Sequence, residues 1–329
     1  MQPARLLMLG TGDFALPTFE RLCDAGRNVV ALITQPDRPQ GRKQEIIPSP
    51  IRLAAERRGV PVHQPESINA PEGVALLRSL RPDLLITAAY GQILSAEVLE
   101  VPARGGINLH GSILPAYRGA APVARAIERG ESETGVTVIA MSPRVDAGGM
   151  IAFATTTIGL DETAGELEDR LALLGAPLVE AALDDVLEGR AAILPQDPGR
   201  VTKAPKLRKE DGRIDWGRPS RQIHNLVRAM QPWPGGFAEF LPPGRSEPIR
   251  LIVHQTAVAE GSGEPGTVVL ASESANRLEI AAGSGAVALL KIQIPGKKPT
   301  TAAEFLRGYR LAPGDRLGPS QPLEGPAAP

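Results

Sequence analysis

Two polar residues that can take part in catalysis stand two positions apart near the middle of the chain, in the segment GGINLHGSILPAYRGAAP. Apolar Ile107 and Leu109 alternate with Asn108 and His110, and a glycine, a serine and a proline follow. This pattern predicts a short strand that ends at the histidine. Side chains two apart on a strand share one face, so Asn108 and His110 are expected to lie side by side.

An aspartate follows the next apolar run of the chain. Asp146 comes shortly after GVTVIAM, Gly135–Met141, which is also predicted to be a strand. Ligands bind in parallel α/β sheets at the edge where the carboxyl ends of the strands meet. We therefore expect Asp146 to join Asn108 and His110 at that edge.

This trio has no protein nucleophile beside it, because Ser112 lacks the G-x-S-x-G frame and Cys23 lies within a predicted helix. Such a set suits transfer of an acyl group directly to an amine. A protonated histidine and an asparagine amide can donate hydrogen bonds to the oxyanion of a tetrahedral intermediate. A carboxylate can hold the histidine charged, and it or a water molecule can accept the proton that the amine loses. The residues alone leave open a transferase and a hydrolase without a covalent intermediate.

The segment GTGDFA, Gly10–Ala15, fits the G-x-G-x-x-A pattern of dinucleotide-binding turns. Such a site also needs an acidic residue about 20 positions further on, at the end of the second strand. That strand ends at Thr34, and the first acid beyond it, Asp37, lies in a proline-rich loop. We therefore interpret the glycines as a tight strand-to-helix turn and prefer this to an oxidoreductase.

The elements that must position the trio alternate through the first half of the chain. Buried strands are predicted at Arg5–Gly10, Val29–Thr34, Asp83–Gly91, Gly106–His110 and Gly135–Met141. Helical spacing and capping residues predict helices at 14–26, 49–58, 123–129 and 163–188. This alternation indicates an α/β fold, a Rossmann-like parallel sheet.

The pattern changes near Pro195–Gly212, where prolines, glycines and basic residues cluster without periodicity, as in a linker between domains. Beyond a helix at Ser220–Ala229, short strand-like segments recur between glycines and prolines. They indicate a small OB-like β-barrel, a fold that often contacts nucleic acid. We therefore predict a catalytic domain at 1–202, a smaller β-barrel domain at 203–317 and a disordered tail at 318–329.

Composition restricts the class of protein. Of the 329 residues, 42% are hydrophobic and 22% are charged, as in a globular protein of two domains. The sequence shows no signal-peptide pattern and no apolar run that could span a membrane. One cysteine and four scattered histidines give no spacing for a metal site. The single cysteine also suits the cytoplasm, where we expect the protein.

Charge is distributed unevenly along the chain. Residues 203–329 carry 17 lysines and arginines against 12 acidic residues, a net charge of +5, within a chain of net charge −1. A positive C-terminal half favours contact with a polyanion, although solvation explains such a bias equally well.

The motif Asn-x-His-x-Ser-x-Leu-Pro-x-Tyr-Arg-Gly-Ala-Ala-Pro at 108–122 resembles the signature of the formyltetrahydrofolate-dependent formyltransferases. QPDRPQGR (35–42), AYGQIL (89–94) and MSPRVDAGGMI (141–151) stand where the other motifs of that family fall. The second half is similar to the family member that acts on charged initiator tRNA, through IDW (214–216), IHNLVRAMQPWPGGF (223–237), GKKP (296–299) and AAEFLRGYR (302–310). The resemblance runs from about Arg5 to Leu317, nearly the whole chain.

The resemblance implies 10-formyltetrahydrofolate as the formyl donor and the α-amino group of methionine on initiator tRNA as the acceptor, with no metal. By matching position, Asn108, His110 and Asp146 would be catalytic. Two loops would bind the pterin end of the folate, through Gly91, Gln92, Ile93, Leu94, Ser112, Ile113, Leu114 and Pro115. Basic residues would contact the tRNA, namely Arg42, Lys43, Lys206 and Lys209. The protein is expected to act as a monomer.

Two positions depart from the family pattern. Ala116 stands where a basic residue is usual, and Gly149 stands where a second acid often follows Asp146. Two other hypotheses remain, a formyltransferase acting on a sugar-nucleotide amine and a catalytically silent RNA-binding protein. The positive second half argues against the first, and the intact trio argues against the second.

Overall fold

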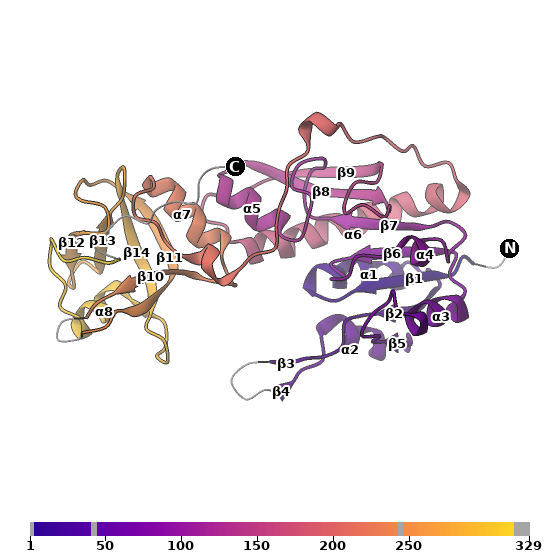
Figure 1. The fold of residues 1–329 in the computed structure, drawn as a ribbon, viewed down its shortest axis with the longest axis horizontal. Helices are drawn as coiled ribbons and strands as arrows, with labels where there is room; N and C mark the ends of the chain where they lie inside the picture. Colours follow the sequence, from indigo (N-terminus) through magenta and orange to yellow (C-terminus); the bar gives the residue numbers. More distant parts are fainter. Residues whose placement is uncertain (1–2, 41–44, 243–245, 319–329) are drawn as a thin grey trace. The chain divides into compact units, whose positions relative to one another are not determined.

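The computed structural model describes residues 3–40, 45–242 and 246–318. Contacts divide the chain into two compact units (Figure 1). The N-terminal unit comprises residues 1–122, 133–157 and 166–205, and the C-terminal unit comprises 123–132, 158–165 and 206–329. Two short segments from the first half of the chain therefore belong to the C-terminal unit.

A seven-stranded sheet forms the centre of the N-terminal unit, in the order β5-β2-β1-β6-β7-β8-β9. The first five strands in this order are parallel to their neighbours, whereas β7, β8 and β9 are antiparallel to one another in succession. The strands are β1 (Leu6–Gly10), β2 (Val29–Ile33), β5 (Val62–His63), β6 (Leu84–Ala88), β7 (Gly106–His110), β8 (Glu133–Ala140) and β9 (Met150–Thr157). The Rossmann-like α/β prediction is confirmed, with a mixed sheet in place of a wholly parallel one.

The central strands are nearly continuous apolar runs because both faces of the sheet are covered. The segments LLMLG of β1 and LLITA of β6 are buried at every position, as strands between two helical layers require. The flanking helices are α1 (Leu16–Asp24), α2 (Pro50–Arg57), α3 (Pro71–Leu80), α4 (Ala96–Leu99) and α6 (Ala164–Glu188) (Figure 1). A 3-10 turn, η1 (Asp13–Ala15), precedes α1, and β3 (Pro39–Gln40) pairs with β4 (Glu45–Ile46) outside the main sheet.

The glycine pattern after β1 has a packing explanation. A Cβ atom on Gly10 would lie 2.5 Å from Cβ of Ala15 and 3.0 Å from the backbone oxygen of Ala88. The turn into the helix therefore requires glycine at this position because strand, turn and neighbouring strand approach closely. This agrees with the interpretation of GTGDFA as a tight turn.

The part of the sheet formed by β7, β8 and β9 differs from the sequence-based prediction. After β7 the chain re-enters the sheet at the edge where β7 ended, so His110 pairs with Thr137 and β8 runs in the opposite direction. Strand β9 was not predicted, although MIAFATTT alternates between more and less exposed positions along the last strand of the sheet. A local apolar pattern carries no information on strand direction, which explains the first difference.

An antiparallel sheet forms most of the C-terminal unit, in the order β10-β11-β14-β13-β12, with β15 paired to β14. Its strands are β10 (Gly236–Phe240), β11 (Ile249–Ala259), β12 (Val268–Ser272), β13 (Arg277–Ala281), β14 (Ala286–Gln293) and β15 (Thr300–Thr301). Phe240 at the end of β10 bridges to Leu317, and Arg316 bridges to Thr267 beside β12. The final described segment thus joins the two edges of the sheet, as in a small barrel.

Three helices accompany this sheet, α5 (Pro122–Arg129), α7 (Ser220–Ala229) and α8 (Ala302–Gly308). The α7 bounds match those predicted. Buried Arg228 of α7 donates from Nη1 to the backbone oxygens of Gly159 and Glu162, at 2.9 and 3.1 Å, and burial lowers the pKa of its guanidinium. These bonds fix segment 158–165 to the C-terminal unit.

The segment predicted as a linker is partly held in place. The chain passes from one unit to the other at Pro205–Lys206, but Leu194 exchanges two backbone hydrogen bonds of 2.8 Å with Met150, and Lys203 bridges to Arg118. Short 3-10 turns, η2 (Pro198–Arg200) and η3 (Lys209–Gly212), lie on either side of the passage. Residues 319–329 of the predicted tail lie outside the described part of the chain.

Candidate active site

Asn108 lies on β7, one strand away from a threonine that orients it. In the parallel register between β6 and β7, Thr87 pairs with Asn108. The Thr87 hydroxyl donates to Oδ1 of Asn108 at 2.7 Å. Because Oδ1 is the acceptor in this bond, the amide presents Nδ2 as its donor end. Thr87 has no local signal in the sequence, since its role depends on strand register.

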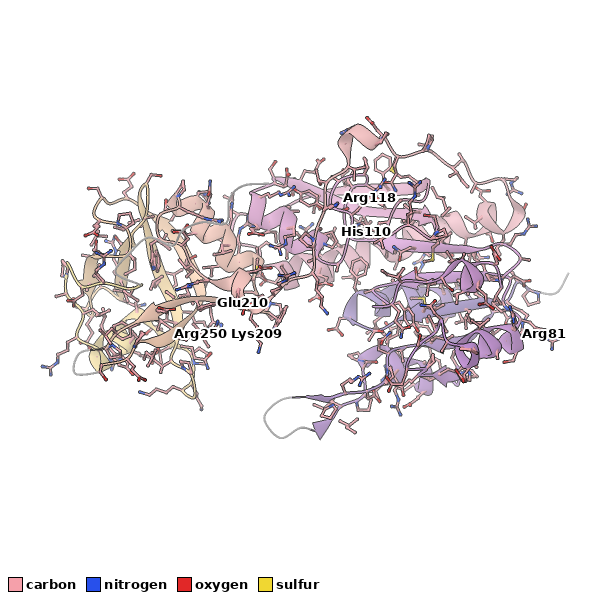
Figure 2. The ribbon with its side chains drawn as sticks, viewed as in Figure 1. Arg81, His110, Arg118, Lys209, Glu210 and Arg250 are labelled. Atoms are coloured by element: carbon pink, nitrogen blue, oxygen red, sulfur yellow. The ribbon has the colours of Figure 1, made fainter. Side chains whose placement is uncertain are left out.

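His110 lies two positions further along β7 (Figure 2), and each of its ring nitrogens faces an oxygen atom. Nε2 lies 3.0 Å from the backbone oxygen of Tyr117, and Nδ1 lies 3.6 Å from Oδ2 of Asp146. Carbonyl and carboxylate oxygens only accept hydrogen bonds, so each ring nitrogen of His110 faces an acceptor. The side chains of His110 and Asp146 are only 6% and 13% exposed, which shields the pair from water.

Asp146 is held in an unusual backbone conformation. Its φ angle is 49°, in the left-handed region, which aspartate tolerates better than most residues. Its Oδ2 also accepts a hydrogen bond of 2.9 Å from the backbone N–H of Gly119. The carboxylate thus faces both His110 and the loop at 117–119. In the predicted trio, Asn108 and His110 lie on one strand and Asp146 lies beside the imidazole ring.

The first predicted folate loop, residues 91–94, follows β6 at the same edge of the sheet. Gly91 has a φ of 88°, and the Gln92 side chain accepts from the Ile68 N–H at 2.9 Å and donates to the Glu66 oxygen at 3.1 Å. Leu94 is buried in the core cluster, whereas Ile93 is 65% exposed. The Gln92 side chain is therefore used to fix the loop.

The second predicted folate loop, residues 112–115, follows β7. Ser112 is fully buried and its hydroxyl donates to the backbone oxygen of Ala116 at 2.7 Å. Thr137 of β8 donates to the Ser112 oxygen at 2.7 Å and accepts from the Leu114 N–H at 3.1 Å. Ile113 and Pro115 belong to the same turn. Both loops thus leave neighbouring parallel strands at one edge of the sheet, the edge that binds ligands in such folds.

The basic residues predicted to contact tRNA are placed only in part. Arg42 and Lys43 lie outside the described residues. Lys206 and Lys209 are exposed on the C-terminal unit, where Figure 2 also shows Arg250. Within the described ranges, no three histidine, cysteine or acidic side chains group as metal ligands, and no helix is long and apolar enough to cross a membrane.

The two departures from the family pattern are compatible with the local packing. A Cβ atom on Gly149 would overlap with Cγ2 of Ile193, so a second acid here would require the Ile193 side chain to move. Ala116 accepts the Ser112 hydrogen bond through its backbone, which any residue supplies.

Comparison with known proteins assigns the chain to a family. The formyl transferase model matches residues 4–183, and the model of the formyl transferase C-terminal domain matches residues 206–310. The chain belongs to the formyl transferase family. It is 43% identical over 318 residues to a protein named methionyl-tRNA formyltransferase from Geotalea uraniireducens, covering 97% of this chain and 99% of that protein. A protein of the same name from Stutzerimonas stutzeri is 41% identical, covering 96% of this chain and 99% of the relative.

Solved structures share the fold at low identity. HypX from Aquifex aeolicus in complex with tetrahydrofolic acid has a TM-score of 0.62 at 20% identity, covering 93% of this chain but 47% of HypX. An N-formyltransferase from Helicobacter canadensis, in complex with folinic acid and dTDP-3-aminofucose, has a TM-score of 0.64 at 16% identity and covers 87% of this chain and 98% of its own. These likenesses support the formyltransferase fold.

Proposed function

We propose that this protein transfers the formyl group of 10-formyltetrahydrofolate to the α-amino group of methionine carried by initiator tRNA, in translation initiation. The observation that carries the proposal is similarity along nearly the full chain, at 41–44% identity, to relatives named methionyl-tRNA formyltransferase. The match to both formyl transferase domains covers the halves predicted to bind folate and tRNA.

The proposed reaction needs no covalent enzyme intermediate. The amine nitrogen forms a bond to the formyl carbon, and the bond between that carbon and N10 of the folate breaks. The amine loses a proton and N10 gains one. The Asn108 amide and a protonated His110 stabilise the oxyanion of the intermediate, and the Asp146 carboxylate balances the charge of the ring. The 3.6 Å approach of Asp146 to His110 and the Thr87 bond that orients Asn108 support these roles.

We propose that the loops at 91–94 and 112–115 bind the folate and that Arg42, Lys43, Lys206 and Lys209 contact the tRNA. The positions of both loops at the ligand-binding edge of the sheet support the first assignment. The net charge of +5 on residues 203–329 supports the second. The proposed domains are a catalytic domain at 1–202 and a tRNA-contacting domain at 203–317.

The direct test is formylation of charged initiator tRNA by the purified protein. Incubation with 10-formyltetrahydrofolate, followed by hydrolysis of the ester and mass spectrometry, should yield formyl-methionine. A dTDP-linked amino sugar offered as acceptor in parallel tests the alternative substrate class. Formylation of the sugar without formylation of the tRNA would reject the proposal.

We further propose that the protein acts as a monomer in the cytoplasm, where initiator tRNA is used. Sedimentation equilibrium of the purified protein tests the oligomeric state, and a mass of two chains would contradict it.

A further inference from the structure

A segment after α6 runs along the loops that surround His110. This segment, residues 194–204, is here named the strap. It begins with the paired hydrogen bonds between Leu194 and Met150 and ends where the Ala204 N–H donates to the Arg118 oxygen at 2.7 Å. All of it belongs to the N-terminal unit. Most of this segment is predicted from the sequence to be a linker, with no role in the site.

The side chain of Gln196 in the strap has its full set of hydrogen bonds. Nε2 donates to the backbone oxygens of Asp146 and Gly148, at 2.8 and 2.7 Å. Oε1 accepts from Nε and Nη2 of Arg118, at 3.0 and 2.7 Å. A carboxamide has two N–H donors and two acceptor lone pairs, so all four are used. A glutamate of the same length could accept from the guanidinium but could not donate to the two carbonyls.

The bonds from Gln196 are directed at the turn that contains Asp146. Asp146 has a left-handed φ of 49°, a conformation that costs free energy for residues other than glycine. Bonds to the carbonyls at 146 and 148 hold the turn from both sides of Ala147. The carboxylate of Asp146 is thereby kept 3.6 Å from Nδ1 of His110.

A second part of the strap holds the group that faces the other ring nitrogen. Thr202 accepts from the Tyr117 N–H through Oγ1 at 2.8 Å and from the Arg118 N–H through its backbone oxygen at 2.9 Å. The Tyr117 oxygen in turn lies 3.0 Å from Nε2 of His110. The next residue, Gly119, passes so close that a Cβ atom there would lie 2.5 Å from the Ala204 oxygen.

We propose that Gln196 is a positioning residue for formyl transfer, which sets the placement of Asp146 and, through Arg118, of the Tyr117 loop on the two sides of His110. This inference rests on the proposed function for its kinetic consequences. Its structural consequence, a fixed Asp146 turn, is independent of the substrate. Gln196 acts only through these groups.

Two substitutions separate the roles of the carboxamide. Gln196→Ala removes all four hydrogen bonds. Gln196→Glu keeps an acceptor for Arg118 but places a carboxylate oxygen against the carbonyls of Asp146 and Gly148. We expect both variants to lower kcat by roughly 10- to 100-fold, the scale of misplaced catalytic groups, with little change in KM for either substrate. Asp197→Ala is the matched control, because its exposed side chain bonds only to Gly199 within the strap.

A double-mutant cycle distinguishes positioning from general destabilisation. If Gln196 acts partly through Asp146, then Gln196→Ala should cost less kcat in the Asp146→Asn background than in the wild type, because only its Arg118 contacts remain to be lost, whereas independent effects multiply. Hydrogen exchange gives a readout without substrate, because the Gly119 N–H donates to Asp146 Oδ2 at 2.9 Å. This amide should exchange faster in Gln196→Ala and Gln196→Glu than in the wild type and Asp197→Ala.

The outcomes are separable. Multiplicative kcat losses, or unchanged Gly119 exchange with wild-type kcat in both variants, would overturn the role of Gln196. If Gln196→Ala does not fold, Gln196→Glu decides by the same measurements. If the wild-type protein does not formylate charged tRNA, the proposed function fails, and the exchange of Gly119 still reports whether Gln196 holds the Asp146 turn.

Discussion

The hydroxyl of Thr87 on β6 donates a hydrogen bond of 2.7 Å to Oδ1 of Asn108 on β7. The two residues are direct partners in the parallel register of these strands. The bond fixes which end of the Asn108 amide is the donor, and His110 lies two positions further along the same strand. The sheet therefore presents an oriented amide donor and a histidine from one strand, at the edge where ligands bind in parallel α/β folds.

Asn108→Ala and His110→Ala should each lower kcat for formyl transfer while leaving folate affinity nearly unchanged. Removal of one oxyanion donor typically costs on the order of 10²–10³ in rate. Single-turnover kinetics and equilibrium binding of the folate check the two quantities separately. A variant that loses folate binding but keeps wild-type turnover at saturation would place its residue in substrate binding instead.

Asp146→Asn should lower kcat at least as much as His110→Ala. The amide oxygen can still accept from the Gly119 N–H, so the turn is kept while the negative charge opposite His110 Nδ1 is lost. Steady-state kinetics with charged tRNA measure kcat, and a near-normal kcat in Asp146→Asn would remove Asp146 from the mechanism.

The parts of the site that the sequence predicts are those with short-range signals. Asn108 and His110 are neighbours on one strand face, and Asp146 follows the next apolar run. Helix α7 could be delimited at Ser220–Ala229 because its spacing and flanking residues are local. Buried strands such as β1 and β6 are recognisable because every residue in them is apolar or small.

The parts that the sequence does not predict depend on contacts between distant residues. Gln196 bonds to a carbonyl 50 positions away, and Thr202 bonds to an N–H 85 positions away. Both residues stand in a proline-rich segment without hydrophobic periodicity, so no local pattern identifies either contact. Strand direction is likewise set by where the chain re-enters the sheet, so the antiparallel pairing of β8 was not evident.

Tyr90 gives a pH-dependent prediction for stability. Its side chain is 4% exposed, its hydroxyl has no hydrogen-bond partner among the described residues, and burial raises its pKa to about 12. In the unfolded chain the pKa of a tyrosine is about 10. The unfolded state therefore loses this proton first, and stability should be fully retained below about pH 10 and fall as the pH rises toward about 12.

The substitution Tyr90→Phe removes both the unpartnered hydroxyl and this titration. We expect a melting temperature at neutral pH equal to or above that of the wild type, because loss of an unsatisfied buried group costs nothing. The decline in melting temperature at alkaline pH should be shallower. Tyr309→Phe, in the C-terminal unit, serves as the control, and an equally steep decline in wild type and Tyr90→Phe would contradict the assignment.

The basic residues of the C-terminal unit lead to the last prediction, which concerns tRNA binding by the whole chain. A protein truncated near Pro205 is unsuitable for this test, because segments 123–132 and 158–165 group with the C-terminal unit and Arg228 bonds to Gly159 within it. Such a truncation would leave these segments without their partners. Substitutions at exposed lysines avoid this problem, and Lys206 and Lys209 are both exposed.

Binding of charged initiator tRNA should weaken steeply with salt, because each phosphate contact releases counterions and adds roughly 0.7–0.9 to the slope of log K against log salt. Lys206→Gln combined with Lys209→Gln should therefore reduce the slope by about 1.4–1.8 if both lysines contact phosphate, and should raise KM for tRNA with little change in kcat.

Arg81→Gln removes an exposed charge from the N-terminal unit and is the control (Figure 2). Fluorescence anisotropy at several salt concentrations measures the slopes. A small amino-sugar acceptor has no polyphosphate backbone, so its binding should lack the steep slope. If the double variant keeps the wild-type slope while the Arg81 variant loses part of it, the C-terminal lysines form only a solvated face and the tRNA binds elsewhere.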